Sequence, residues 1–387
     1  MSTIQKSFLT QDAARLVALL SGNVENIRTL SIDEWEDLIH LAANNGVSQM
    51  LYTAIKAQLI VPPSVIFESI RSIHLASVVQ STIKFNELKK ILIAFENFSI
   101  TVIPVKGAWL GEAVYGNIAL RGMGDVDLWV DRADIEVAKK AMKSLGYLSS
   151  SSRKDRPKEL QEELIGEIQF FKSGAPMVEL HWTIYPGEWL RHASGIVELD
   201  IWQRSLPYKS DKVRQLTAED TIIHIAIHLA VNHQMSMSGL RTLLDLDMVR
   251  KKLSVDWACL AGRAKEWHVE TAMWLVLRML ELVFGDPEQT LPLNTLQPSA
   301  LRRSVLERFI TPEGICNGLV IRESPIRFLF LFALVDNPFE ALWLLWRTLV
   351  PDNTWFTLRY GLQNAPKWRV FLQRLWHPLS IAWHKEI

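Results

Sequence analysis

Two aspartates separated by one residue, Asp125 and Asp127, stand inside the largely apolar run RGMGDVDLWV. Side chains two residues apart on a β-strand leave the same face, so both carboxylates would project together while Val126, Leu128 and Val130 serve the interior. Two carboxylates about 5 Å apart repel each other by roughly 3 kcal/mol at an effective dielectric constant of 20. A divalent cation removes that penalty, and carboxylate pairs are typical of Mg²⁺ or Mn²⁺ sites that share their ion with phosphates.

A Lys-Gly pair, Lys106 and Gly107, follows the apolar run TVIPV and precedes GAWLGEAVY, whose apolar spacing predicts a helix. A glycine at such a position lets phosphate oxygens approach backbone N–H groups at a helix start, where the helix dipole favours anions. Lys106 would add a positive charge to a polyphosphate held there, the alternative being an exposed lysine at a helix start. Arg121, four residues before Asp125, is a second candidate for a phosphate contact.

A third acidic ligand is expected from the segment MVELHWTI, residues 177–184. Its β-branched and aromatic content predicts a strand on which Glu179 and His181 share one face. A neighbouring strand with Glu179 would complete a cluster of three carboxylates. Such a cluster binds metal and lowers the pKa of an attacking hydroxyl, or supplies a general base.

The runs KGAWL, RGMGDVDLWV, ADIEVAKKAMKSLGY and VELHW together resemble an uncharacterised bacterial nucleotidyltransferase family of the polymerase-β-like superfamily. More distantly, the chain is similar to the abortive-infection AbiEii-type nucleotidyltransferases, whose pattern is Lys-Gly-Gly-Thr, a spacer, then Arg-x-x-x-Asp-x-Asp. The match covers about residues 95–190. The resemblance implies an α+β protein in which a small mixed-sheet nucleotidyltransferase core is flanked by helical N-terminal and C-terminal regions. It also implies transfer of a nucleoside monophosphate from a nucleoside triphosphate such as ATP to an acceptor, with release of pyrophosphate.

Carried over residue by residue, the resemblance implies that Asp125, Asp127 and Glu179 are the catalytic carboxylates and the ligands of Mg²⁺ or Mn²⁺. Lys106 and Gly107 would face the phosphates. The acceptor is left open between a small molecule, a peptide and a tRNA.

Two departures from the superfamily pattern concern the phosphate contacts. Gly107 is followed by Ala108 rather than by a second glycine or a serine, and sixteen residues separate Ala108 from Asp125. The missing hydroxyl supports an alternative function, a non-catalytic nucleotide-binding or regulatory module on a nucleotidyltransferase fold. Retention of the three carboxylates favours the enzyme.

Further candidates lie on predicted helices after Thr217, which we expect to be an N-cap. Arg241 and Asp245, four residues apart, either contact nucleotide phosphate and ribose or form a surface ion pair. On the predicted strand of residues 177–184, His181 is either a nucleotide-binding residue or a core histidine. Three histidines cluster in TIIHIAIHLAVNH, and we expect them to pack beside the site with hydrogen bonds, zinc binding being the alternative; these are His224, His228 and His233.

The length of the chain predicts a multidomain protein, and its two distant cysteines are typical of a reducing compartment. We expect the 387 residues to divide into a helical N-terminal lobe (1–98), a catalytic core (99–213) and a helical C-terminal domain (214–387). Inside the core, the charged segment 150–160 is expected to be a solvated loop or a hairpin connection. The 42 basic and 42 acidic residues give no bulk attraction to nucleic acid or membrane. With two distant cysteines, Cys259 and Cys316, and no signal peptide pattern, we expect a cytoplasmic protein.

The apolar segment IRFLFLFALVDNPFEALWLLWRTLV is interrupted by Asp336, Asn337, Pro338 and Glu340, so no transmembrane segment is expected. Two helices joined at Asp-Asn-Pro are predicted instead. The tryptophans and arginines between Trp343 and Trp383 either form an interfacial surface or belong to an ordinary helical core with amphipathic edges, and the second is favoured.

Overall fold

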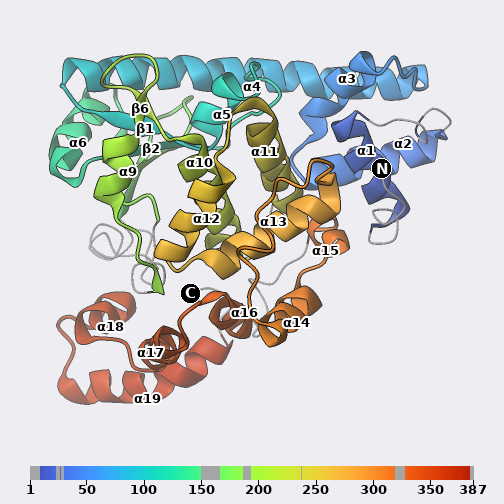
Figure 1. Ribbon diagram of the computed structural model, residues 1–387. Helices are drawn as coiled ribbons and strands as arrows, with labels where there is room; N and C mark the ends of the chain where they lie inside the picture. The colour runs from blue at the N-terminus through green and yellow to red at the C-terminus, as the bar shows by residue number, and fades with distance from the viewer. Residues whose placement is uncertain are drawn as a thin grey trace.

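The computed structural model contains a five-stranded mixed sheet in the order β1-β2-β5-β4-β3. Figure 1 labels two of these strands, β1 and β2. β2 pairs in parallel with β5, and the other pairings are antiparallel. The prediction of an α+β protein with a small mixed sheet is confirmed. The strands are β1 (Val102–Pro104), β2 (Val126–Val130), β3 (Leu148–Ser149), β4 (Glu167–Phe171) and β5 (Val178–His181).

The structure describes residues 9–22, 27, 30–149, 166–185, 193–236, 238–318 and 327–383. The charged loop predicted at 150–160 lies outside this part of the chain.

The two faces of β2 enter different cores. Val126, Leu128 and Val130 join a cluster covered by α4 (Ser64–Asn97) and α6 (Ile135–Ser144). Trp129 joins the largest cluster, made mainly by the other helices. Asp125 and Asp127 share the face of Trp129 by the two-residue period of a strand. The carboxylates therefore point toward the helices that follow the sheet in sequence.

The N-terminal helices end at residues that interrupt helices. α1 (Gln11–Ser21) ends at Gly22 in the left-handed conformation, and the Pro62-Pro63 pair separates α3 (Ser48–Ala57) from α4 (Ser64–Asn97). α2 (Ile32–Asn44) lies between α1 and α3 in sequence, and the division of these helices into a separate N-terminal lobe stays a prediction. α4 extends along these helices and over the sheet, where it packs on α6 (Ile135–Ser144) (Figure 1).

The helices that follow the sheet in sequence pack around one central helix, α10 (Ala218–Ile227). Thr217 caps α10 by accepting a hydrogen bond from the Asp220 N–H, as predicted. Around α10 pack α11 (Gly239–Lys252), α12 (Trp257–Glu266) and α13 (Glu270–Phe284). Their largest hydrophobic cluster also includes residues of α1–α3 and of α16 (Arg327–Leu334), so one core runs through the three predicted domains. The boundaries of these domains stay a prediction.

The C-terminal helices form a separate layer at the end of the molecule away from α4 (Figure 1). α16 (Arg327–Leu334) and α17 (Pro338–Leu349) are separated at Asp336-Asn337, as predicted, and the Asn337 side chain caps α17. Among the described residues, no helix has the length and apolarity needed to cross a membrane. The remaining elements are α5 (Gly107–Ala113), α9 (Glu198–Arg204), α14 (Ala300–Phe309), α15 (Pro312–Cys316), α18 (Asn353–Tyr360), α19 (Lys367–Trp383) and the short strands β6 (Leu206–Pro207) and β7 (Arg214–Gln215).

Candidate active site

The turn between β1 and α5 holds Lys106 against Asp127. The Val105 N–H donates to the Asp127 carbonyl at 3.1 Å, which carries the β1–β2 pairing up to the turn. The Lys106 ammonium then donates to Asp127 Oδ1 at 2.7 Å, from a backbone with φ of 50° that is uncommon outside glycine. The alternative of an exposed helix-start lysine is wrong, because the side chain is mostly covered and paired.

Gly107 is required by a close contact within the protein. A Cβ on Gly107 would lie 2.9 Å from Met123 Cβ and 3.4 Å from Arg121 Nη1. The glycine therefore lets the chain around residues 121–123 approach α5. Since α5 has only seven residues, side-chain charges must supply most of any attraction for phosphate.

Asp127, Glu179 and His181 converge from two neighbouring strands. In the parallel pairing of β2 with β5, Asp127 stands opposite Glu179 and Trp129 opposite His181. His181 Nε2 lies 3.2 Å from Asp127 Oδ1 and 3.7 Å from Glu179 Oε2. One potential ligand atom from each residue lies within 4.8 Å of the others, and this is the group of metal-capable side chains found in the described part of the chain.

Burial and the surrounding charges set the protonation of this cluster. Burial, with repulsion from Asp127 and Glu167, raises the pKa of Glu179 to about 7. Burial alone would raise the pKa of Asp127 as well, but the Lys106 ammonium and His181 outweigh it and lower that pKa. For His181, burial opposes the charged ring, and the hydrogen bond with Asp127 holds the pKa above its ordinary value. A carboxyl that titrates near neutral pH beside an ionised carboxylate is typical of a proton-transfer site.

Asp125 lies just before β2, partly exposed, at the rim of the cluster. Burial and the charge of Asp127 raise the pKa of its carboxyl group. It is near enough to feel Asp127 and Lys106, but it is not part of the three-residue group. Its part in metal binding stays a prediction.

Arg121 and Asp245 form a buried ion pair with each other. Arg121 Nε donates to both Asp245 oxygens, at 2.7 and 2.9 Å, and the Tyr115 hydroxyl donates to Asp245 Oδ1 at 2.9 Å. Both charged side chains are almost fully buried. Of the two alternatives for Arg241 and Asp245, a surface ion pair between them is therefore wrong, and a contact of either residue with nucleotide stays a prediction. Arg121 also donates to the Gly122 carbonyl at 2.8 Å, so the pair fixes the chain that leads into Asp125.

The Arg241 guanidinium includes a buried nitrogen that makes no hydrogen bond to the described residues. This nitrogen is Nε, and the guanidinium packs beside Gly46. Burial and the nearby charge of Arg121 lower the pKa of Arg241, and Asp125 is among the acidic groups that act on it. A guanidinium near the carboxylates is suited to bind an anion.

The three histidines of the α10 region pack beside the site, as predicted, but the hydrogen bonds expected for them are missing at His224. Neither of its ring nitrogens has a partner in the described part of the chain, and burial lowers the pKa of His224 to about 3. His228 and His233 stack edge to face at 4.4 Å, at a short π-helix over His228–Asn232. A small pocket lies between this region and the side chains of Lys106 and His181; its lining is Val105, Lys106, Trp129, His181, Ile184, His224 and His228.

Sequence reasoning missed β4, which carries two polar neighbours of the cluster. Gln169 Nε2 donates to Glu179 Oε1 at 2.8 Å, and Glu167 Oε2 lies 3.7 Å from His181 Nδ1. The signal was the alternation of Glu167 and Gln169 with Ile168 and Phe170, which is typical of a strand with one polar face.

Residues 31–285, about two thirds of the chain, match a protein family described as uncharacterised nucleotidyltransferase. The match includes the sheet, the Lys106 turn, α10 and α11. No curated protein and no solved structure matches the chain.

Proposed function

The chain belongs to this uncharacterised nucleotidyltransferase family, and on that premise we propose that it transfers a nucleoside monophosphate from a nucleoside triphosphate to an acceptor, with release of pyrophosphate. The observation that carries the proposal is the register of β2 and β5, which sets Asp127 opposite Glu179 with His181 beside both. This cluster combines an ionised carboxylate with one that titrates at neutral pH.

The donor set fits Mg²⁺ or Mn²⁺. Asp127 and Glu179 would hold the ion, with Asp125 at the rim and His181 as a nitrogen donor that suits Mn²⁺ better than Mg²⁺. Once bound, the ion would neutralise phosphate charge and lower the pKa of the acceptor hydroxyl. Lys106 now holds Asp127 Oδ1, so its ammonium would have to leave that oxygen for a metal.

The reaction needs a proton acceptor and groups that bind phosphate. The acceptor oxygen forms a bond to the α-phosphorus while the bond to the bridging oxygen of pyrophosphate breaks, and the hydroxyl proton goes to Glu179. The pKa of Glu179 is about 7 in the metal-free protein. This carboxylate serves as the base where Asp125 and Asp127 hold the ion, which is the alternative to Glu179 as a ligand. Lys106, displaced from Asp127, and Arg241 would bind the triphosphate oxygens. Arg121 would act only through position, since Asp245 holds it.

The test is a transfer assay with each nucleoside triphosphate labelled at the α-phosphate, Mg²⁺ or Mn²⁺, and a cell extract as the source of acceptor. Label in a small-molecule, peptide or tRNA product, with matching pyrophosphate, would support the proposal and identify the acceptor. Absence of label with all four ribonucleotides and their deoxy forms would refute it.

One observation favours the second candidate, a non-catalytic nucleotide-binding module. The Lys106 ammonium already neutralises Asp127, so the acidic cluster has an internal counter-ion. Such a module would bind the triphosphate equally well with a chelator present and would release no pyrophosphate. Nucleotide titrations with Mg²⁺ and with a chelator separate the two functions, because the enzyme requires the metal for tight binding.

A further inference from the structure

The last helix, α19, turns its polar side to the protein and its apolar side outward. His377 Nε2 is 3.0 Å from the Thr348 carbonyl oxygen, and Arg374 donates to the Pro351 carbonyl at 3.0 Å. The opposite face exposes large apolar side chains, half or more of whose surface is open: Trp368, Phe371, Leu372, Leu375, Trp376 and Leu379. This is the reverse of an ordinary surface helix, whose apolar stripe faces the core.

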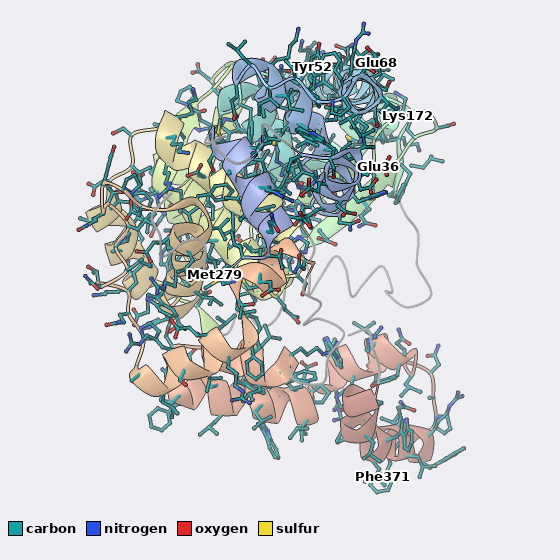
Figure 2. All side chains as sticks on the ribbon, turned by 90° about the vertical axis from the view of Figure 1, so that its right-hand side faces the viewer. Glu36, Tyr52, Glu68, Lys172, Met279 and Phe371 are labelled. Atoms are coloured by element: carbon teal, nitrogen blue, oxygen red, sulfur yellow. The ribbon has the colours of Figure 1, made fainter. Side chains whose placement is uncertain are left out.

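α17 repeats this arrangement beside α19, on which it packs. Leu344 is buried, while Phe339 is 79% exposed and Trp346 is 62% exposed. Figure 2 shows the C-terminal helices at the edge of the molecule, with the labelled Phe371 side chain pointing away from the other helices. The favoured prediction of an ordinary helical core in this region is therefore wrong for these side chains. Exposed aromatic patches of this kind mark interaction sites.

The charges beside this surface favour an anionic partner. Residues 338–383 carry five basic and two acidic side chains, although the whole chain is balanced, and they hold six of its fifteen tryptophans. Lys367 and Arg369 at the start of α19 are exposed beside the apolar face. A second copy docked through the same face would bring these like charges together, whereas anionic headgroups would match them.

We propose that α17 and α19 form a docking surface for the interface of a lipid bilayer that contains anionic lipids. Helices with a broad Trp/Phe/Leu face and basic flanks lie in the plane of such an interface, with tryptophan at headgroup depth. α19 has 17 residues and α17 has 12, and neither is long and apolar enough to span the bilayer. The proposal is independent of the nucleotide site.

The test is flotation of the purified full chain with vesicles of phosphatidylcholine alone or mixed with phosphatidylglycerol. We expect the wild-type protein to float with the mixed vesicles, and Phe371→Gln with Leu375→Gln to weaken binding at least about tenfold. Lys367→Glu with Arg369→Glu should weaken binding to the mixed vesicles by a similar factor. The matched control is Val79→Gln with Ile83→Gln, an exposed pair with the same spacing on α4, which should bind as the wild type does.

A measurement on the wild-type protein guards against misfolded variants. Brominated lipid in the mixed vesicles should quench tryptophan fluorescence, because Trp346, Trp368 and Trp376 would enter the headgroup region. Absence of both flotation and quenching would overturn the proposal. So would light scattering that finds a wild-type dimer which Phe371→Gln with Leu375→Gln dissociates, since the face would then bind a second copy.

Discussion

Asp127 and Glu179 are direct partners in the parallel pairing of β2 with β5, so their side chains leave the same face of the sheet at neighbouring positions. A slip of the pairing by one residue would turn one of them into the opposite core. The backbone register thus holds together two carboxylates that repel each other, and the Lys106 ammonium offsets part of that repulsion.

Lys106→Ala should weaken triphosphate binding far more than nucleoside binding. The change removes the ammonium group that would bind the phosphate oxygens. A nucleoside has no phosphate group, so its affinity should change little. Competition titrations with a triphosphate and its nucleoside would measure both affinities. Equal losses would mean that Lys106 serves only as the counter-ion of Asp127.

Glu179→Gln should cut transfer by at least about 100-fold, the usual effect of losing an acid-base group, without disturbing the fold. The glutamine oxygen can still accept the hydrogen bond from Gln169. Rates under saturating triphosphate, with circular dichroism of the same samples, provide the measurement. Transfer within a few-fold of the wild type would exclude Glu179 as the base.

The same variant should change how stability depends on pH in the presence of a chelator. The pKa of Glu179 is about 7 in the folded protein against an ordinary value of 4.5, so the folded state holds a proton that the unfolded chain releases. This contribution is complete below the ordinary value and is lost as the pH rises through about 7. Relative to the wild type, Glu179→Gln should therefore gain on the order of 1–3 kcal/mol between about pH 5 and pH 8. Melting curves at the two pH values test this, and a constant difference would contradict the raised pKa.

Gly107→Ala should destabilise the protein by about 1–3 kcal/mol, because the new Cβ would meet Met123 Cβ at 2.9 Å. Gly124→Ala is the matched control in the same loop region, since a Cβ there has nothing within 4 Å. Denaturant unfolding of both variants gives the free energies. Equal effects would show that the contact with Met123 does not require the glycine.

Asp245→Asn should cost about 3–5 kcal/mol of stability, because Arg121 would be left charged and buried without its partner. The exposed pair of Lys209 and Glu112 supplies the control, and Glu112→Gln should cost less than about 1 kcal/mol. Both free energies of unfolding come from denaturant titration. A loss at Asp245 no larger than at Glu112 would mean that water reaches Arg121.

Local sequence patterns predicted the helices and strands that carry the site. They could not predict contacts between elements that are distant in sequence. The alternation of apolar residues around Asp127 predicted β2, and the β-branched and aromatic residues around Glu179 predicted β5. Thr217 predicted the start of α10. The partner of Asp245 is Arg121, 124 residues away, and that contact depends on how α11 packs against the segment between α5 and β2. The outward apolar face of α19 was equally hidden, because periodicity shows that a helix has two faces without showing which one the protein covers.

Metal-dependent transfer is measured as pyrophosphate release from a labelled triphosphate, with the accepting extract present, in wild-type protein and in Asp127→Asn. Asp127→Asn removes the carboxylate that faces Glu179 and pairs with Lys106. Release should require Mg²⁺ or Mn²⁺, stop with a chelator and fall at least about 100-fold in the variant. Release that is equally fast in the variant, or that continues with a chelator, would mean that Asp127 holds no catalytic metal.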